Sequence, residues 1–332
     1  MKTELEHLHA IELPTPFPVG PITVYLADAP GEPLTLIDTG PRTAEARAAL
    51  EKALALRGYR SADLGQIVIT HAHVDHYGLA ANLVASSNAS VLSHAWNVSA
   101  LGDHDADRQR RIAFYAQLLQ QAAVPREVVE LVGGATRGMG RFAQHVTVAT
   151  SLEEAQILRF AGHGWQILHT PGHAAGLICL YEPQSRTLLS SDHLLADISS
   201  NPVVEPPRPG QTERPKSLAL YIASLRRVAA LKVNLALPSH GPAIQDVSRL
   251  VTKRLGFHQR RKQQVLDALH NGARTTWAIT QALFPNLSPL DTFLAVSEVI
   301  GHLDLLEIEE RIVGEQADGV ISWRVAASAL SA

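Results

Sequence analysis

A nine-residue stretch dense in histidine constrains this chain more than any other part of it: Thr70-His71-Ala72-His73-Val74-Asp75-His76-Tyr77-Gly78. It follows a β-branched apolar run over residues 66–70, which predicts a short buried strand. Side chains at a strand end and in the next turn can point to one place, and imidazole nitrogens and carboxylate oxygens suit zinc, iron or manganese. The spacing is far denser than scattered histidines would produce, so the stretch predicts a metal site.

Three later segments repeat this pattern of a strand followed by a histidine or an aspartate. His173 follows a predicted strand through Thr170-Pro171-Gly172, where proline and glycine favour a sharp turn. Asp192 follows the predicted strand 187–190, and His240 follows the apolar run 235–237. One such segment alone is weak, but four strand-end segments together predict one constellation of ligands.

Length and composition indicate a globular chain with two domains. Its 332 residues suit a large catalytic domain, residues 1–250 with a helical insertion at about 103–140, followed by a small domain at 251–332. The chain is 46% hydrophobic and 18% charged, which is enough apolar material for a core. Its net charge of −3 argues against a nonspecific binder of polyanions.

Nothing in the sequence points to export or to a membrane. Residues 1–12 are charged and lack the apolar stretch of a signal peptide, and no run approaches the length of a membrane span. The single cysteine, Cys179, excludes an internal disulfide and sits in an apolar run, which indicates a buried thiol. We therefore expect a cytoplasmic protein without membrane contacts.

Several residues near the ligand segments have two readings. Asp38 either orients a metal ligand or holds the turn into the predicted helix 43–56. His193, beside the predicted ligand Asp192, points away from the site if the strand alternation continues and is a pocket residue if a bulge brings it in, and Tyr77 is a candidate pocket residue of similar standing. Two predicted helices, 107–122 and 125–132, the second ending at two glycines, either cover the site or pack on the sheet. The proline-rich segment 201–210 is either a cleft wall or a bare connection.

The ligand series resembles the metallo-β-lactamase superfamily: His71-Ala72-His73-Val74-Asp75-His76, then His173, Asp192 and His240, in that family's order. Within it the chain is similar to the hydroxyacylglutathione hydrolase branch and to the lactamase-beta-2-like group, which has a winged-helix-like tail. The segments 192–195 and 301–306 also resemble that group's.

This resemblance implies a four-layer αββα sandwich with a dinuclear site at one sheet edge. One metal would be bound by His71, His73 and His173, the other by Asp75, His76 and His240, with Asp192 bridging them. The cofactors implied are two divalent metal ions, zinc being expected, with iron or manganese as alternatives.

The chemistry implied is hydrolysis by a hydroxide that bridges the two metals. Asp75 would orient that hydroxide and carry a proton to the leaving group. The diiron flavoproteins of the superfamily have glutamate where this chain has His73, a departure that argues for hydrolysis and against oxygen reduction.

The C-terminal segment reads as three helices, 257–269, 277–283 and 289–306, and a hairpin of strands 307–313 and 320–325, with Ser288 and Pro289 starting the third helix. This order is typical of a winged helix. Residues 251–332 hold eight basic and nine acidic side chains. This balanced charge does not provide the basic surface that a protein needs to bind duplex nucleic acid. We expect this tail to pack on the catalytic domain or on a second subunit of a homodimer, and the basic stretch 260–262 to be a solvated helix face.

Three functions remain after this reading. The first is cleavage of a carboxylic ester, thioester or lactone of a small metabolite. The second is a phosphodiesterase or endoribonuclease acting on single-stranded RNA, which should need a cluster of basic side chains that the sequence does not show. The third is a non-catalytic winged-helix binding protein, against which the seven intact ligand positions argue.

Overall fold

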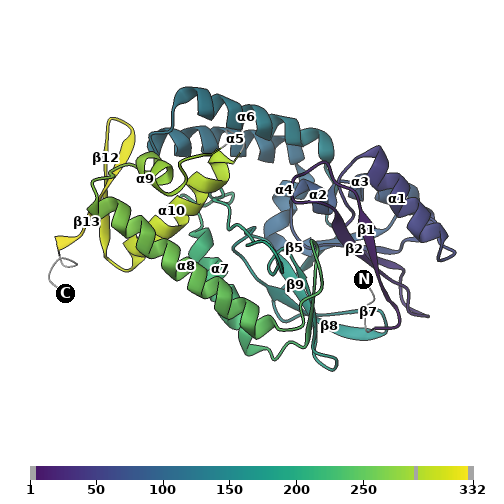
Figure 1. Cartoon of the computed structure of the whole chain (residues 1–332). Helices are drawn as coiled ribbons and strands as arrows, with labels where there is room; N and C mark the ends of the chain where they lie inside the picture. The colour runs from purple at the N-terminus through teal and green to yellow at the C-terminus, as the bar shows by residue number, and fades with distance from the viewer. Residues whose placement is uncertain (1–4, 288–290, 328–332) are drawn as a thin grey trace.

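Two facing β-sheets form the centre of the molecule (Figure 1). The structure is a computed structural model that describes residues 5–287 and 291–327. The first sheet has the strand order β1-β2-β3-β4-β5-β6, with bounds Leu8–Leu13, Ile22–Ala27, Thr35–Ile37, Gln66–Ile69, Ser90–His94 and Thr150–Leu152. The second has the order β11-β10-β9-β8-β7, with bounds Leu235–Pro238, Thr187–Ser191, Ile178–Glu182, His163–His169 and Ile157–Phe160.

Helices cover the outer face of each sheet. The helices α1 and α3 pack on the first sheet, and α7 packs on the second together with the start of a later helix, α8. The bounds of the helices before α8 are α1 Ala44–Ala55, α2 Val74–Tyr77, α3 Ala80–Ser87, α4 Val98–Gly102, α5 His104–Gln121, α6 Arg126–Met139 and α7 Ser217–Ala230.

The alternation of side chains along the central strands produces these layers. On β4, Ile67 packs toward α1, whereas its neighbour Val68 lies in the core between the sheets. On β10, Leu188 packs toward α7, whereas Leu189 lies between the sheets. Strands that are apolar on both faces must be covered on both faces. The predicted αββα sandwich is therefore confirmed.

The helical insertion connects the sandwich to the C-terminal segment. In Figure 1, α5 and α6 lie along the top of the molecule, and their apolar side chains share a core with α10 (Thr292–Ile308). The prediction that the second insertion helix ends at Gly133 is wrong, because α6 continues to Met139. A glycine costs roughly 1 kcal/mol inside a helix, and the packing of Val128, Val129 and Val132 in this core outweighs that penalty.

The C-terminal segment consists of three helices and a hairpin with its own apolar core. Its elements are α8 Val247–His270, α9 Thr276–Leu283, α10, β12 Ile312–Ala317 and β13 Val320–Val325. The first helix begins ten residues before the predicted start, because the side chain of Asp246 caps it by accepting from the backbone of Arg249. The domain boundary expected at residue 250 thus falls inside α8. The expected helix start at Ser288 and Pro289 lies outside the described residues.

The C-terminal segment packs on the catalytic domain, which was one of the two predicted arrangements. Ion pairs contribute to this contact. Asp304 of α10 binds Arg214, in the segment before α7. The expectation of a solvated basic stretch at 260–262 is wrong for two of its residues. Arg261 and Lys262 are largely buried, and they pair with Glu298 inside α10 and with Glu309 just after it. A periodic pattern cannot show that an acidic partner faces a basic one. Among the described helices, none is long and apolar enough to cross a membrane.

Candidate metal centre

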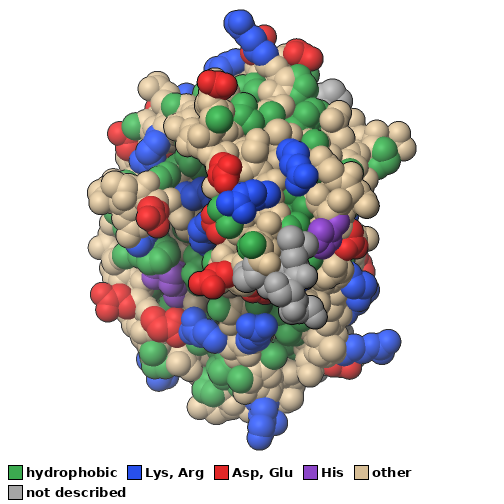
Figure 2. All heavy atoms as spheres, turned by 90° about the vertical axis from the view of Figure 1, so that its left-hand side faces the viewer, with side chains coloured by type: hydrophobic (Ala, Val, Ile, Leu, Met, Phe, Trp, Pro, Cys, Tyr) green, Lys and Arg blue, Asp and Glu red, His purple; other side chains and the backbone are tan. Residues whose placement is uncertain are grey.

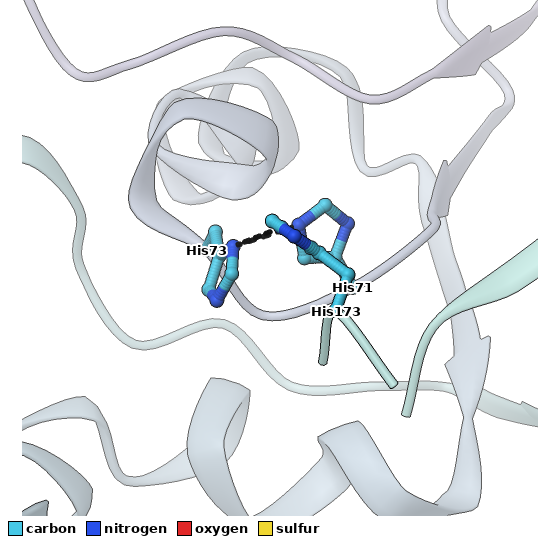
Figure 3. Close-up of side chains that lie close together, drawn as sticks. All are labelled: His71, His73 and His173. Atoms are coloured by element: carbon cyan, nitrogen blue, oxygen red, sulfur yellow. Dashed lines mark hydrogen bonds between the residues drawn. The ribbon is translucent and has the colours of Figure 1, made fainter. Parts of the chain in front are cut away.

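The predicted ligands meet where four strands of the two sheets end. The loop after β4 carries four of them, and the ends of β8, β10 and β11 deliver the other three: His71, His73, Asp75, His76, His173, Asp192 and His240. Figure 3 shows the rings of His71, His73 and His173 turned toward one another. The turn before His173 requires glycine, because a Cβ on Gly172 would lie 2.4 Å from the Cβ of Tyr221.

The ligand atoms form two sets. In the first, His73 Nδ1 lies 2.9 Å from His71 Nε2 and 3.0 Å from His173 Nε2. In the second, His240 Nε2 lies 3.5 Å from an oxygen of Asp75, with His76 close by. A tetrahedral metal with bonds of 2.0–2.1 Å separates its ligands by about 3.3 Å. The spacings therefore suit direct binding of a metal ion in each set.

Asp192 lies between the two sets. Its Oδ2 is 3.4 Å from His173 Nε2 and 3.5 Å from His76 Nε2, and its Oδ1 is 3.8 Å from His240 Nε2. One carboxylate therefore faces histidines of both sets. This is the position that a bridging ligand needs.

The outer nitrogens of three ligand rings are held by acceptors. His76 Nδ1 donates to Asp38 Oδ2 at 2.8 Å, His240 Nδ1 to the carbonyl of Pro21 at 2.8 Å, and His173 Nδ1 to the carbonyl of Asn201 at 3.1 Å. A proton held on the outer nitrogen leaves the inner nitrogen free to bind a metal. These bonds prepare the rings as ligands.

Asp38 has both of the roles that the sequence allowed, because it holds a turn and orients a predicted metal ligand. Besides accepting from His76, its carboxylate accepts from the backbone and the hydroxyl of Thr70, both at 2.8 Å. Thr70 in turn lies 2.8 Å from the hydroxyl of Ser191, beside Asp192. Asp38 has a φ of 58°, a left-handed conformation that aspartate tolerates better than most residues. One carboxylate thus holds a turn and ties both ligand loops together.

Burial and neighbouring charges set the protonation of the ligands. Burial, with His173 second, lowers the pKa of His73 to about 3, so this ring is neutral at neutral pH. Burial raises the pKa of Asp192, but His76 and other histidines outweigh it and hold the pKa below its usual value. Neutral imidazoles and an ionised carboxylate are the states that bind metal. Burial lowers the pKa of His76, but the charges of Asp192 and Asp38 outweigh it and raise the pKa well above its usual value, so a metal ion would displace a proton from this ring.

The site also contains buried polar atoms that no group of the described chain satisfies. His76 Nε2, His240 Nε2 and Asp192 Oδ1 are buried without a hydrogen-bond partner. A buried polar atom costs roughly 1–3 kcal/mol when it is left unpaired, and these three point into the ligand cluster. A nitrogen and oxygen set of this kind fits zinc, iron or manganese. The residues present therefore fit the metals that the resemblance implies.

The two candidate pocket residues lie elsewhere. Tyr77 is buried in the core under the first sheet, and its hydroxyl lies 2.5 Å from His104 Nδ1. His193 is fully buried with its ring against Tyr221. Neither lines a hollow at the site. Cys179 is buried as predicted, and burial raises the pKa of its thiol to about 12.

Two hollows that share lining residues lie beside the ligands. A small one of about 40 Å³ contacts His73, and a groove of about 640 Å³ lies between α5 and the proline-rich segment. Both are lined by Arg110 of α5 and by residues 206–208. The segment 201–210 is therefore a wall of the cleft, and the helical insertion covers its other side. The sequence singled out both segments but missed the arginines, which carry no motif.

Comparison with known proteins gives these positions a family context. A family model described as "Metallo-beta-lactamase superfamily" matches residues 17–240, a span that holds all seven predicted ligands. The probable metallo-hydrolase YqjP of Bacillus subtilis is 37% identical over 310 residues, which cover 92% of this chain and 94% of that protein.

More distant relatives agree with this result. The atrochrysone carboxyl ACP thioesterase AacuM of Aspergillus aculeatus is 24% identical over 246 residues, covering 73% of this chain and 69% of that protein. Among solved structures, a metallo-beta-lactamase family protein of Thermus thermophilus superposes with a TM-score of 0.80 at 27% identity, covering 97% of this chain and all of the other. The similarity thus includes the C-terminal segment.

Proposed function

Because the chain belongs to the metallo-β-lactamase superfamily and is a metallo-hydrolase, we propose that it binds two divalent metals and cleaves a carboxylic ester, thioester or lactone of a small molecule, with thioesters the first choice. The observation that carries this proposal is the position of Asp192 between two sets of ligand atoms. A single metal would leave one of these sets, and its buried nitrogens, without a partner.

What divalent cations supply at such a site is an activated water nucleophile and stabilisation of negative charge on the carbonyl oxygen. The protein holds the ligands rigidly through the outer hydrogen bonds of His76, His173 and His240. Asp75 is the candidate proton carrier. Burial raises the pKa of Asp75, but the charge of His76 and a hydrogen bond from His240 lower it by more. The pKa of Asp75 is therefore below its usual value.

An ionised Asp75 can accept a proton from the attacking water on the carboxylate oxygen that does not face His240, and can return it to the departing sulfur or oxygen. The acyl carbon gains the water oxygen, the bond to sulfur or oxygen breaks, and the products are an acid and a thiol or alcohol. Asp75 ends in its starting state. No cofactor is consumed.

Acyl cleavage is favoured over cleavage of RNA by three observations. Relatives such as AacuM are thioesterases by name. The face of the molecule that carries the C-terminal segment shows lysine and arginine interspersed with aspartate and glutamate, without a continuous basic surface (Figure 2). A single-stranded RNA substrate should need a continuous basic groove along its backbone, whereas two of the arginines that line the hollows, Arg111 and Arg214, pair with carboxylates.

The proposal is tested by comparing two substrates on zinc-loaded protein, a small acyl thioester and an activated phosphodiester, with Asp192→Asn as the blank. We expect thioester cleavage far above the phosphodiester rate, and neither above background in the variant. A phosphodiester rate above the thioester rate would overturn the proposed substrate class. Equal rates in the variant and the parent protein would overturn the proposed site.

A further inference from the structure

Arg208, in the proline-rich segment, is held on a stack of aromatic rings beside the metal centre. Its guanidinium carbon lies 3.5 Å from the centre of the Trp96 ring. Trp96 packs edge-on against His169 at 4.6 Å, and His169 stacks on His94 at 3.9 Å. Burial, with His169 second, lowers the pKa of His94 to about 4. At neutral pH Arg208 is thus a cation on a rigid and uncharged support.

Two other arginines, Arg111 of the small hollow and Arg214 of the groove, are neutralised by carboxylates. Arg111 of α5 lies between Asp107 and Glu205, at 2.7 and 3.0 Å. Arg214, at the far end of the groove, makes a two-pronged contact with Asp304 at 2.6 and 2.7 Å. Neither has charge to spare for a ligand.

Arg208 and Arg110 differ from these two. Among the described residues Arg208 makes no ion pair, and its one side-chain hydrogen bond runs from Nε to Gln211 at 3.2 Å. Arg110 pairs with Asp107, but its Nε is buried without a partner. Asp107 already serves Arg111. The local balance therefore leaves about one positive charge uncompensated where these side chains meet.

The position of the pair limits what can reach it. Arg110 and Arg208 line both the small hollow at His73 and the larger groove, so they lie where the two are adjacent. A water molecule needs roughly 10–15 Å³ in this measure, so the hollow of about 40 Å³ has room only for a thin chain. A group held at the arginines therefore lies beside a small hollow that reaches one predicted ligand, His73.

We propose that Arg208, assisted by Arg110, binds a negatively charged group, a carboxylate or a phosphate, which the substrate carries on an unbranched arm attached to the sulfur or oxygen that leaves its acyl group. This inference rests on the proposed function, because it places the cleaved bond at the metal centre. A guanidinium that lacks a carboxylate is a ready partner for either anion. The small hollow favours a linear arm over a bulky ring.

The test measures binding separately from cleavage. Two matched pairs of non-cleavable S-ethyl thioethers are titrated calorimetrically into the full-length, zinc-loaded protein. One pair is N-acetylcysteamine against N-succinylcysteamine, which adds a carboxylate. The other is N-(4-hydroxybutanoyl)cysteamine against its phosphate ester, which adds a phosphate at the end of an equally unbranched arm. We expect the anionic member of one pair to bind about tenfold more tightly, and the pair that responds identifies the anion.

Variants show whether Arg208 causes the difference. Arg208→Gln should reduce the ratio of Kd values in the responding pair to about one, whereas Arg208→Lys should keep most of it. Arg226→Gln is the matched control, because Arg226 is an exposed arginine of α7 that lines neither hollow. It should leave the ratio unchanged. Equal Kd values within both pairs, absence of binding, or an unchanged ratio in Arg208→Gln would overturn the inference.

Hydrolysis of the corresponding acyl thioesters, followed in parallel, separates the two proposals. Cleavage without any preference for an anionic arm would remove the anion site and leave the proposed function. A preference in Kd without cleavage would keep the anion site and remove the proposed function. Where both hold, Arg208→Gln should raise KM for the anionic thioester about tenfold and leave kcat nearly unchanged.

Discussion

Asp192 and Asp304 are both buried carboxylates, with 5% and 1% of their surface exposed, yet their surroundings differ. Asp304, in α10, has two cations within hydrogen-bond distance, Arg214 at 2.6 Å and Lys216 at 2.9 Å. Asp192, at the end of β10, faces histidine nitrogens at 3.4–3.8 Å, and its Oδ1 has no partner. The first carboxylate is satisfied by the chain itself. The second is arranged around a position that the chain does not fill.

This difference separates a structural charge from a ligand. Burying a carboxylate is costly unless a positive charge offsets it. At Asp304 the offset comes from side chains that connect the tail to the segment before α7. At the metal centre three carboxylates, Asp192, Asp38 and Asp75, outweigh burial and raise the pKa of His76 well above its usual value. The same negative potential favours a divalent cation.

The largest effect is expected from Asp192→Asn. Amide nitrogen and oxygen keep the shape of the side chain but remove the charge shared by both ligand sets. Changes in groups that merely orient ligands cost 10–100-fold, so we expect hydrolysis to fall more than about 100-fold and bound metal to fall with it. Kinetics and elemental analysis measure both. Full metal content in this variant would mean that Asp192, like Asp304, is not needed for metal binding.

Asp38 tests the support beneath the ligands. Asp38→Ala removes the acceptor for His76 and for Thr70, and we expect metal affinity to fall roughly 10–100-fold, measured by competition with a chromophoric chelator. Asp38→Asn is the matched control. Asparagine tolerates the left-handed backbone and keeps one acceptor oxygen, so its loss should be smaller. Equal affinity in the parent protein and the alanine variant would mean that Asp38 serves only the turn.

Asp304→Asn should affect stability instead of metal binding. Two cations lose their carboxylate, and because both are partly exposed we expect a loss of about 2 kcal/mol in the free energy of unfolding. Denaturant titration measures it, with Glu315→Gln, from an exposed pair on the hairpin, as a control expected to lose less than about 1 kcal/mol. A drop in metal content with stability unchanged would reverse the roles of the two aspartates.

Trp96→Leu is expected to have the smallest effect. The ring supports Arg208 but does not supply its charge, and an exposed cation–π contact is worth roughly 0.5–1 kcal/mol. The preference for an anionic arm should therefore weaken about threefold, measured as the ratio of Kd values in the responding thioether pair. A loss as complete as that in Arg208→Gln would show that Trp96 itself contacts the ligand.

The resemblance to the metallo-β-lactamase superfamily predicted the sandwich, whereas local patterns predicted the seven clustered residues. A histidine or aspartate directly after a short buried strand lies at the sheet edge. The groove could not be predicted in this way. Whether Arg208 is free while Arg111 and Arg214 are paired depends on carboxylates distant in the chain, as 94 residues separate Arg111 from Glu205.

The remaining differences have several origins. The glycines of α6 violate a local signal that tertiary packing overrides, whereas the early start of α8 follows a local signal, the cap at Asp246, that the prediction left out. Tyr77 and His193 are pocket candidates only through their proximity in sequence to ligands. Tyr77 packs in the core of the first sheet, and the ring of His193 packs against Tyr221, as expected if the strand alternation continues past Asp192.

The central claim is a site for two metals built around Asp192, and the most direct measurement is a zinc titration of the metal-free protein followed by thioester hydrolysis. The account predicts that activity rises until two zinc ions are bound per chain and then stays constant. A plateau at one zinc ion per chain, or activity that is independent of zinc in the metal-free protein, would contradict it.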